Sequence, residues 1–274
     1  MTTLAISPDR WTFDGTDLSS YAYLLASGTD LEDLPPLRGE DVAVPYLPGR
    51  RWAAKLPDSK RLSLALLVTD QAVGGGLSLP DGRQQFQANL DGLRLALAKP
   101  GRRSLVHHLP GGSSRTAQAE CLGLQVGEMR GNREGVVAVA DFMLADPYFY
   151  GPNVVDTARA ISASPTAFAL VHPGTARTNR VSFDFTGPIS NPRVTNATNG
   201  IYVECLVTVG AGLHLIVDCD LFTAANDGVS SIGSIRHSGD FRWMVLEPGS
   251  NSLSVTATAP GGTLTTTAAA PYHG

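Results

Sequence analysis

The chain lacks long hydrophobic runs, runs of one charge and a leader-like amino terminus. No apolar stretch approaches the roughly 18 residues of a membrane-spanning helix, and no basic run exceeds a pair such as Arg50-Arg51 or Arg102-Arg103. With a net charge of −4, this predicts no membrane span and no nucleic-acid binding, because nucleic-acid surfaces concentrate positive charge. The first residues lack the basic-then-apolar order of a signal peptide, so we expect assembly in a cytosol.

Cysteine is also scarce. Cys121, Cys205 and Cys219 are an odd number and have no CxxC spacing. This pattern predicts buried free thiols rather than a disulfide framework or a zinc site.

Motifs for catalysis and phosphate binding are missing. Adjacent side chains on a strand point to opposite faces, so His107 and His108 cannot bind one metal ion from the strand predicted there. There is no HExxH or GxSxG pattern, and the Gly74-Gly75-Gly76 run lacks the Lys-Ser/Thr of a phosphate-binding loop, which favours a linker. We therefore expect no enzyme activity, no catalytic residue and no cofactor.

A second possible metal site lies in the acidic turns late in the chain. Asp218, Asp220, Asn226 and Asp227 could suggest calcium binding, but their spacing does not match the ligand order of an EF-hand loop. Acidic residues at sheet ends usually form solvated turns. We expect no metal.

The residues that are abundant predict a packed, mainly β protein. Hydrophobic residues make up 43% and charged residues 17%, while 29 glycines and 18 prolines provide many turns. Residues 141–152 end an apolar run with Asp146-Pro147, three aromatics and Gly151-Pro152, which stops regular structure. We place a domain boundary there, giving domains 1–152 and 153–274.

The first domain is predicted to be a β-sheet or barrel with one helix. Leucine and valine alternate from Arg61 to Asp70, which indicates a core strand covered on both faces. Asp81 is expected to begin a helix that ends before Lys99-Pro100-Gly101. The apolar residues of this helix are expected to share one face. The other expected strands are 11–13 and 21–26, which form a first hairpin, and 104–109, 116–126 and 135–144.

The second domain is predicted to be an antiparallel sandwich or jelly roll, because short strands follow closely with no helix between them. Residues 154–166 are interpreted as a linker. A turn at 210–212 is expected to join strands that share a core containing Cys205 and Cys219. The expected strands are 167–171, 180–185, 192–196, 201–209, 213–219, 241–246, 252–258 and 263–267.

The segment 30–52 is expected to be an extended arm or edge hairpin, since proline cannot donate to a central β-ladder. Tyr, Trp and Arg dominate interface hot spots, and prolines reduce the entropy lost on docking. The alternative is an ordinary loop folded on its own domain. As interface candidates the arm offers Tyr46, Pro48, Arg50, Arg51 and Trp52.

Five motifs, taken in order, resemble the distal tail (Dit-like) protein family, minor tail proteins of long, non-contractile-tailed bacteriophages. They are Asp-Leu-Pro-Pro-Leu-Arg-Gly at 33–39, Pro-Gly-Arg-Arg at 48–51, Ala-Asp-Pro-Tyr-Phe-Tyr-Gly at 145–151, Asn-Pro-Arg-Val-Thr-Asn at 191–196 and Leu-Glu-Pro-Gly-Ser-Asn-Ser-Leu-Ser-Val at 246–255.

The resemblance implies a split-barrel amino-terminal domain that closes into a homo-hexameric ring through a protruding hairpin, followed by a galectin-like sandwich. It implies a structural virion protein at the tail tip, in the baseplate, assembled in the host cytoplasm. The implied partners are the tail tube protein, the tape measure protein, and the hub, tail-associated and receptor-binding proteins.

Two rival functions are kept open. A carbohydrate-binding module could attach the particle to the host surface, with Trp243 as a stacking face. Asn191-Pro192-Arg193 echoes part of the galectin signature, but the expected histidine is Ile189 and the second half of the signature is absent. On its predicted strand Trp243 is expected to be core. An enzyme that trims cell-wall polymers is the second rival.

Overall fold

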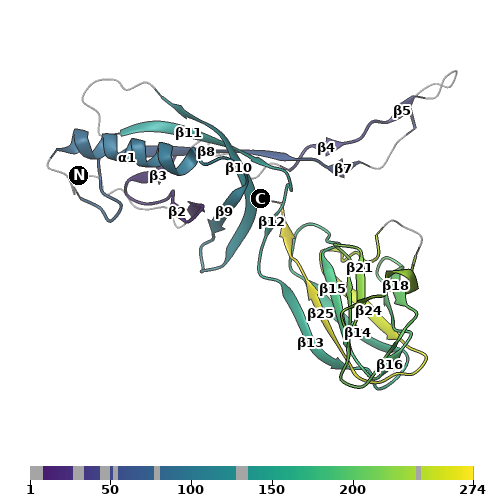
Figure 1. Ribbon diagram of the computed structural model, residues 1–274. Helices are drawn as coiled ribbons and strands as arrows, with labels where there is room; N and C mark the ends of the chain where they lie inside the picture. The colour runs from purple at the N-terminus through teal and green to yellow at the C-terminus, as the bar shows by residue number, and fades with distance from the viewer. Residues whose placement is uncertain are drawn as a thin grey trace. The chain divides into compact units, whose positions relative to one another are not determined.

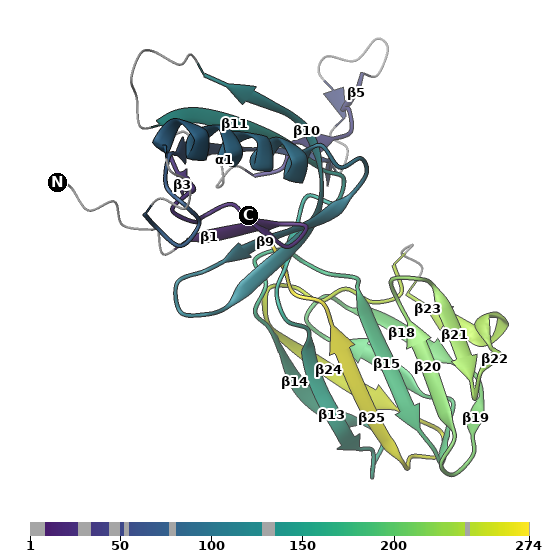
Figure 2. The same ribbon diagram turned by 60° about the vertical axis from the view of Figure 1, so that its left-hand side comes forward.

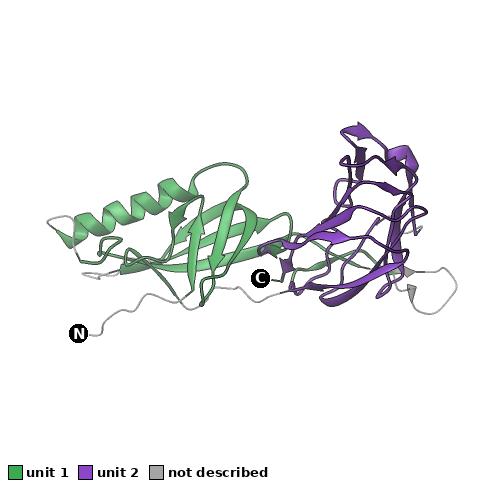
Figure 3. Ribbon diagram, turned by 90° about the horizontal axis from the view of Figure 1, so that it is seen from below, with its two compact units in different colours: residues 1–149, 273–274 green, residues 150–272 purple. Residues whose placement is uncertain are grey.

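The computed structural model describes residues 9–26, 34–43, 50–51, 55–76, 81–127, 135–238 and 242–273, and for residues 42–43 and 50–51 it describes the backbone. The chain forms two compact units, Met1–Phe149 with His273–Gly274, and Tyr150–Tyr272 (Figure 3). Both units are built mainly from antiparallel strands (Figure 1). The prediction of a mainly β protein is therefore confirmed.

A curled antiparallel sheet forms the body of the first unit (Figure 2). Its strands follow the order β2-β1-β9-β10-β11-β8-β3, and β12 (Phe149–Tyr150) comes after β11 in the chain. The strands are β1 (Arg10–Phe13), β2 (Thr16–Asp17), β3 (Tyr23–Leu25), β8 (Lys60–Thr69), β9 (Arg103–His108), β10 (Ser114–Val126) and β11 (Gly135–Leu144).

Strand β8 is the core strand predicted from its alternation. Leu62, Leu64, Leu66 and Val68 are each exposed by 1% or less. All ten residues of β8 pair with β11, whose alanines and Phe142 bury against the same core. A period of two therefore places one whole row of side chains in the interior.

The predicted first hairpin is partly wrong. β1 does turn back at Asp14 and Gly15, both of which have positive φ, but it pairs with the short strand β2. The second expected strand, β3, pairs with β8 at the other end of the sheet order. The residues between β2 and β3 thus carry the chain across the unit rather than around a tight turn.

Helix α1 (Gly82–Leu97) covers one face of the sheet (Figures 1 and 2). The Asp81 carboxylate accepts a hydrogen bond from the Arg83 backbone N–H, which satisfies one of the unpaired donors of the first turn. Leu90, Leu93 and Leu97 are buried in the first core. The start of the helix, its end and its apolar face agree with the prediction.

Two buried amides on the same helix face were not predicted. Asn89 donates to the backbone carbonyls of Thr69 (2.8 Å) and Gln71 (2.7 Å), at the end of β8. Gln85 in turn donates to the Asn89 side chain at 2.9 Å. These bonds fix the helix against the strand end, because a buried carbonyl without a donor is costly.

Gly92 allows a second polar contact between the helix and the sheet. The Tyr23 hydroxyl donates to the Asn89 carbonyl at 2.9 Å, and a Cβ at position 92 would lie 3.2 Å from that hydroxyl. Glycine in a helix interior is a mild penalty on propensity alone, and this contact gives Gly92 a packing reason.

A separate hairpin leaves the first unit between β3 and β8. It consists of β4 (Leu37–Arg38) paired with β7 (Leu56–Pro57), and β5 (Val42–Ala43) paired with β6 (Arg50–Arg51). Among the described strands, these four form no ladder with the main sheet. The expectation of an arm or hairpin for 30–52 is confirmed for these strands.

The second unit is a β-sandwich (Figure 2). One sheet has the order β13-β25-β15-β20-β21-β22 and the other β14-β24-β17-β18-β23. The first contains β13 (Val154–Ala160), β15 (Val181–Thr186), β20 (His214–Asp218), β21 (Thr223–Asn226), β22 (Val229–Ser230) and β25 (Thr263–Ala268). The second contains β14 (Thr166–His172), β17 (Arg193–Asn196), β18 (Ile201–Cys205), β23 (Ile235–His237) and β24 (Gly249–Thr256).

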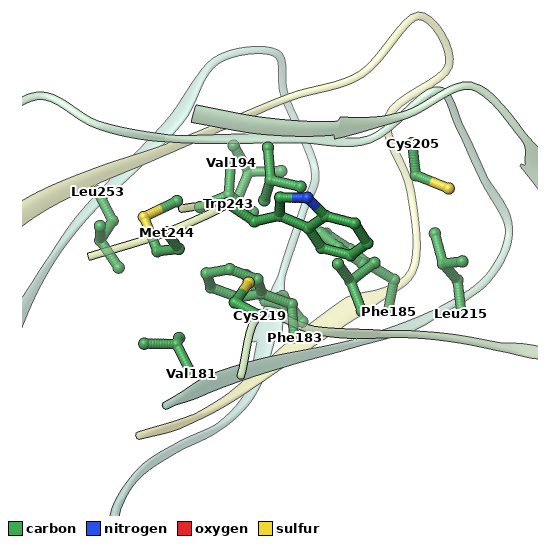
Figure 4. Close-up of a cluster of buried hydrophobic side chains, with 14 of the residues drawn as sticks. Val181, Phe183, Phe185, Val194, Cys205, Leu215, Cys219, Trp243, Met244 and Leu253 are labelled. Carbon is green, nitrogen blue, oxygen red and sulfur yellow. The ribbon is translucent and has the colours of Figure 1, made fainter. Parts of the chain in front are cut away.

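Four short elements complete this unit. A small pair joins β16 (Ile189–Ser190) to β19 (Thr208–Val209). The 3-10 helix η1 (Ile232–Ser234) precedes β23, and β26 (Pro271–Tyr272) ends the unit. Side chains from both sheets meet in the core, including Phe183, Phe185, Leu215 and Leu253 (Figure 4).

Three predictions for the second unit are wrong. Residues 154–160 are strand β13 rather than a linker, because this edge strand is held by its ladder with β25 and not by an apolar pattern. The single strand expected over 201–209 is broken into β18 and β19, and β18 and β20 enter opposite sheets. The turn expected at 210–212 is present. Cys205 and Cys219 still share the core.

The third error is the strand expected at 241–246. Trp243, Met244, Val245 and Leu246 are all buried, whereas a strand with one solvent face would bury every second residue. Leu246 forms an isolated bridge with Thr178. The segment is irregular and packs on both sides.

Gly92→Ala should raise the free energy of unfolding more in a Tyr23→Phe background than in the natural chain. Alanine stabilises a helix interior by about 0.5–1 kcal/mol over glycine, but here its Cβ presses on the Tyr23 hydroxyl. Calorimetric melting of all four variants measures this coupling. Equal effects of Gly92→Ala in both backgrounds would show that the hydroxyl contact is unimportant.

Candidate assembly surface

The hairpin formed by β4 to β7, called the arm, combines two paired segments with different registers. Leu37 pairs with Pro57 near its base, and Val42 pairs with Arg51 further out. Three residues, 39–41, separate the paired segments on one side and four, 52–55, on the other. One extra residue on one strand bends a ribbon and strengthens its twist, so the outer pair points in a different direction from the base.

Polar contacts hold the described base of the arm together. The Asp58 backbone N–H donates to the Pro36 carbonyl at 2.7 Å, and Lys55 lies 3.5 Å from the Asp41 carboxylate across the ribbon. Lys60 begins β8 two residues after Asp58. The arm therefore leads directly into the core strand β8.

Large apolar side chains at the arm base face solvent. Leu34 is 71% exposed, Leu37 62% and Leu56 46%. A two-stranded ribbon is at best marginally stable without a packed face. Exposed leucines on such a ribbon mark a surface that gains stability when another surface covers it.

Two of the candidate interface residues lie further out. Arg50 and Arg51 pair through their backbones with Ala43 and Val42, which places them in the outer segment. Tyr46, Pro48 and Trp52 lie outside the described residues, as do the side chains of both arginines. Their role in an interface stays a prediction.

The structure keeps the neighbouring histidines apart, as strand geometry predicted. His107 stacks on Trp11 with ring centroids 4.1 Å apart and lies 3.6 Å from the Asp9 carboxylate. Burial lowers the pKa of His107, which Asp9 partly opposes. His108 instead lies 3.4 Å from the Thr12 hydroxyl. The two rings share no ligand position.

The acidic turn after β20 uses its carboxylate locally. Asp218 accepts hydrogen bonds from the backbone N–H groups of Asp220 (2.9 Å) and Leu221 (3.0 Å), as a solvated Asx turn does. Asn226 donates to the Thr208 carbonyl. Over the part of the chain that the structure describes, no group of three or more His, Cys, Asp or Glu residues could hold a metal ion.

All three cysteines are free thiols, as predicted. Cys205 and Cys219 are buried, and desolvation raises the pKa of Cys205 to about 11 and that of Cys219 further still. Cys121 differs from the expectation because it is half-exposed. Burial raises the pKa of Cys121 as well.

Two motifs quoted from the sequence meet in the second core. Asn196 ends one and is fully buried, and Asn251 lies in the other. The Asn196 amide donates to the Val245 carbonyl (2.9 Å) and to the Asn251 side-chain oxygen (3.0 Å). Asn251 then donates to the Glu247 carbonyl and accepts from the Glu247 N–H. These amides hold the irregular segment that carries Trp243 through Leu246.

The residues that suggested sugar binding are occupied by internal contacts. Trp243 is 7% exposed and packs edge-on against Phe222, with ring centroids 5.6 Å apart (Figure 4 shows it inside the core). Asn191 donates to the Thr258 hydroxyl, and the Arg193 guanidinium lies 3.7 Å from the centre of the Tyr202 ring. Trp243 is a core residue, as predicted, and offers no open stacking face.

The fold and the arm together define a class: a two-unit β protein with a curled sheet, a sandwich and a solvent-exposed arm. In the residues that the structure describes, no helix is long and apolar enough to cross a membrane. Residues 173–268, most of the second unit, match the family model described as the siphovirus-type tail component, C-terminal domain.

Solved structures extend the comparison over the whole chain. The crystal structure of the SPP1 Dit protein, described as a paradigm of the hub adsorption apparatus in phages that infect Gram-positive bacteria, aligns with a TM-score of 0.66 at 14% identity. The alignment covers 95% of this chain and 98% of that one. The two proteins therefore share a fold.

Weaker matches come from the phage P2 baseplate in its activated conformation. The structure with Ca aligns at 9% identity with a TM-score of 0.41, covering 96% of this chain and 98% of that one. The structure with Sr aligns at 9% identity with a TM-score of 0.38, covering 94% and 97%. A search of curated protein sequences found no match.

The resemblance to distal tail proteins that the sequence motifs indicated is confirmed by the family model and the SPP1 Dit fold. Residues 173–268 thus match the siphovirus-type tail component family, and the chain shares the fold of SPP1 Dit over 95% of its length.

Replacing Asn196 with alanine should lower the free energy of unfolding of the second unit by about 2–3 kcal/mol. Val245 and Asn251 each keep another donor, the Asn199 amide and the Glu247 N–H, but the Thr198 N–H loses its acceptor. Asn196→Asp should cost more at neutral pH, because a carboxylate would face two acceptor oxygens.

Thermal melting of the full chain measures both variants. Exposed Asn153 in the same unit provides the matched control, and Asn153→Ala should change stability by less than about 0.5 kcal/mol. An Asn196→Ala protein that melts like the control would mean that the amide network contributes little.

Proposed function

We propose that this protein forms a ring of identical subunits at the distal end of the phage tail, hexameric as the family resemblance implies. The ring joins the tail tube to the tail-tip hub and receptor-binding proteins, and the tape measure protein meets it from the tube. Its role is structural, with no catalysis and no cofactor. The family match of the second unit and the shared fold with SPP1 Dit support this proposal.

The arm is the main structural observation in support of the proposed ring. It leaves the first unit as a narrow ribbon with leucines exposed by 46–71%, while the core from which it extends is complete within one chain. An arm that reaches a different surface on the next copy makes a heterologous contact, and such contacts close into a ring when their rotation allows. Each subunit then gains the burial that its own chain does not supply.

The alternative function, a carbohydrate-binding module in residues 153–274, loses its aromatic candidate. Sugars stack on exposed aromatic faces, whereas Trp243 is buried and its replacement would damage the core. A glycan array with the full chain remains its test, with Arg193→Ala as the informative variant. We favour the ring because the exposed leucines need a partner surface.

Leu34→Glu with Leu37→Glu should abolish association while leaving the subunit folded. Both side chains are exposed within one chain, but burying two carboxylates in an apolar contact is strongly unfavourable. Light scattering of the full chain over a concentration series measures the change. Leu95→Glu, at a 76% exposed position of α1, is the matched control and should assemble normally.

A chain that is monomeric at every concentration without any substitution contradicts the ring. A ring that persists in the double variant contradicts the role of the arm base.

Tyr46→Ala with Trp52→Ala should weaken association by about 2 kcal/mol or more at each interface, because truncated hot spots cost that much. Circular dichroism melting should show little change in subunit folding. Sedimentation velocity compares assembly of the double variant with the unaltered chain. Identical assembly would remove these two aromatics from the interface.

A further inference from the structure

A groove in the first unit lies where the end of helix α1 passes the middle of β10. It encloses about 320 Å³. One wall is the last turn of the helix and the residues that follow it, and the other is a short stretch of β10. The lining residues are Arg94, Leu97, Ala98, Lys99, Pro100, Cys121, Leu122, Gly123 and Leu124.

The groove exists because β10 is longer than its neighbour. β9 pairs with Ser114 through Ala119 only, while β11 pairs with Ala119 through Val126 on the opposite edge. The ladder with β9 ends at Ala119, and the β10 residues that line the groove, Cys121 to Leu124, lie beyond it; β12 also pairs with β10. Where a strand edge has no partner, it offers backbone donors and acceptors to another chain.

A bulge in the ladder with β11 lies beside the groove. The register of β10 shifts between Cys121 and Gly123, and Leu122 at the bulge is 51% exposed. Leu97 and Pro100 supply further apolar lining from the helix side. The charged residues of the lining are both cations, Arg94 and Lys99, each already paired with one carboxylate.

The arm base has the complementary features. It presents Leu34 and Leu37 to solvent, followed by exposed Glu40. Its proline-bracketed strand is narrow and extended, the form in which a chain adds to a sheet edge. The described residues of the arm are not among those that line the groove of the same chain.

We propose that this groove receives the arm base of a neighbouring copy. Leu37 lies against Leu122 and the apolar lining, and Glu40 lies beside the cationic rim at Lys99. This inference rests on the proposed ring and names the acceptor surface of the contact. Arm and groove are different surfaces of one subunit, so the contact is head-to-tail and repeats around a closed assembly.

Native Cys121 in the groove allows a direct test with the full chain. A Leu37→Cys variant, treated with a short bis-maleimide, should give a covalent ladder of dimers and higher species on a denaturing gel. Cys205 and Cys219 are buried and stay unmodified. Adding Cys121→Ser should remove the ladder. Val73→Cys, at a 60% exposed site, should give about tenfold less product, because only docked thiols have a high effective concentration.

Light scattering of the same samples separates the two levels of the proposal. Association without cross-linking above the Val73→Cys level overturns the groove as acceptor and leaves the ring standing. A chain that does not associate at any concentration overturns both. Cross-linking that survives Cys121→Ser also rules out the groove.

Discussion

Strand β8 is the element on which the first unit depends. Its alternation commits one row of leucines to the core, and a shift of one residue would turn the whole row to the other face. The same strand pairs along its full length with β11 and is approached by the arm at its first residue. The arm therefore leads into the core through β8, with only Asp58 and Ser59 between β7 and β8.

Buried side-chain amides form hydrogen bonds with backbone groups that apolar packing cannot satisfy. In the first unit, Asn89 satisfies carbonyls where β8 ends and no ladder continues. In the second, Asn196 and Asn251 hold a segment that has almost no strand pairing of its own. In both places the polar side chain replaces backbone partners that the fold does not provide, which is the condition under which a buried amide stabilises a structure.

Strong periodicity made β8 and α1 predictable, because the apolar residues of each fit the period of a single kind of element. For α1, Asp81 and Lys99-Pro100-Gly101 also mark the two ends. The arm was predictable because proline excludes a central strand. β13 was missed because polar residues such as Asp156 and Arg159 belong to an edge strand, whose stability comes from the ladder with β25. The irregular path of Trp243 through Leu246 could not be inferred, because apolar residues at alternate positions fit a strand equally well. The groove beside β10 depends on how far β9 extends along its neighbour, which no local pattern records.

The amide clamp around Asn196 has a consequence for how such a tail component can vary. It ties one end of β17 to the segment before β24, whereas the turns between β20 and β23 are not among its partners. Apart from Phe222, which packs on Trp243, the residues of those turns can change without loosening the clamp. The periphery of the sandwich can thus vary to fit new neighbours while the packing of its interior stays the same.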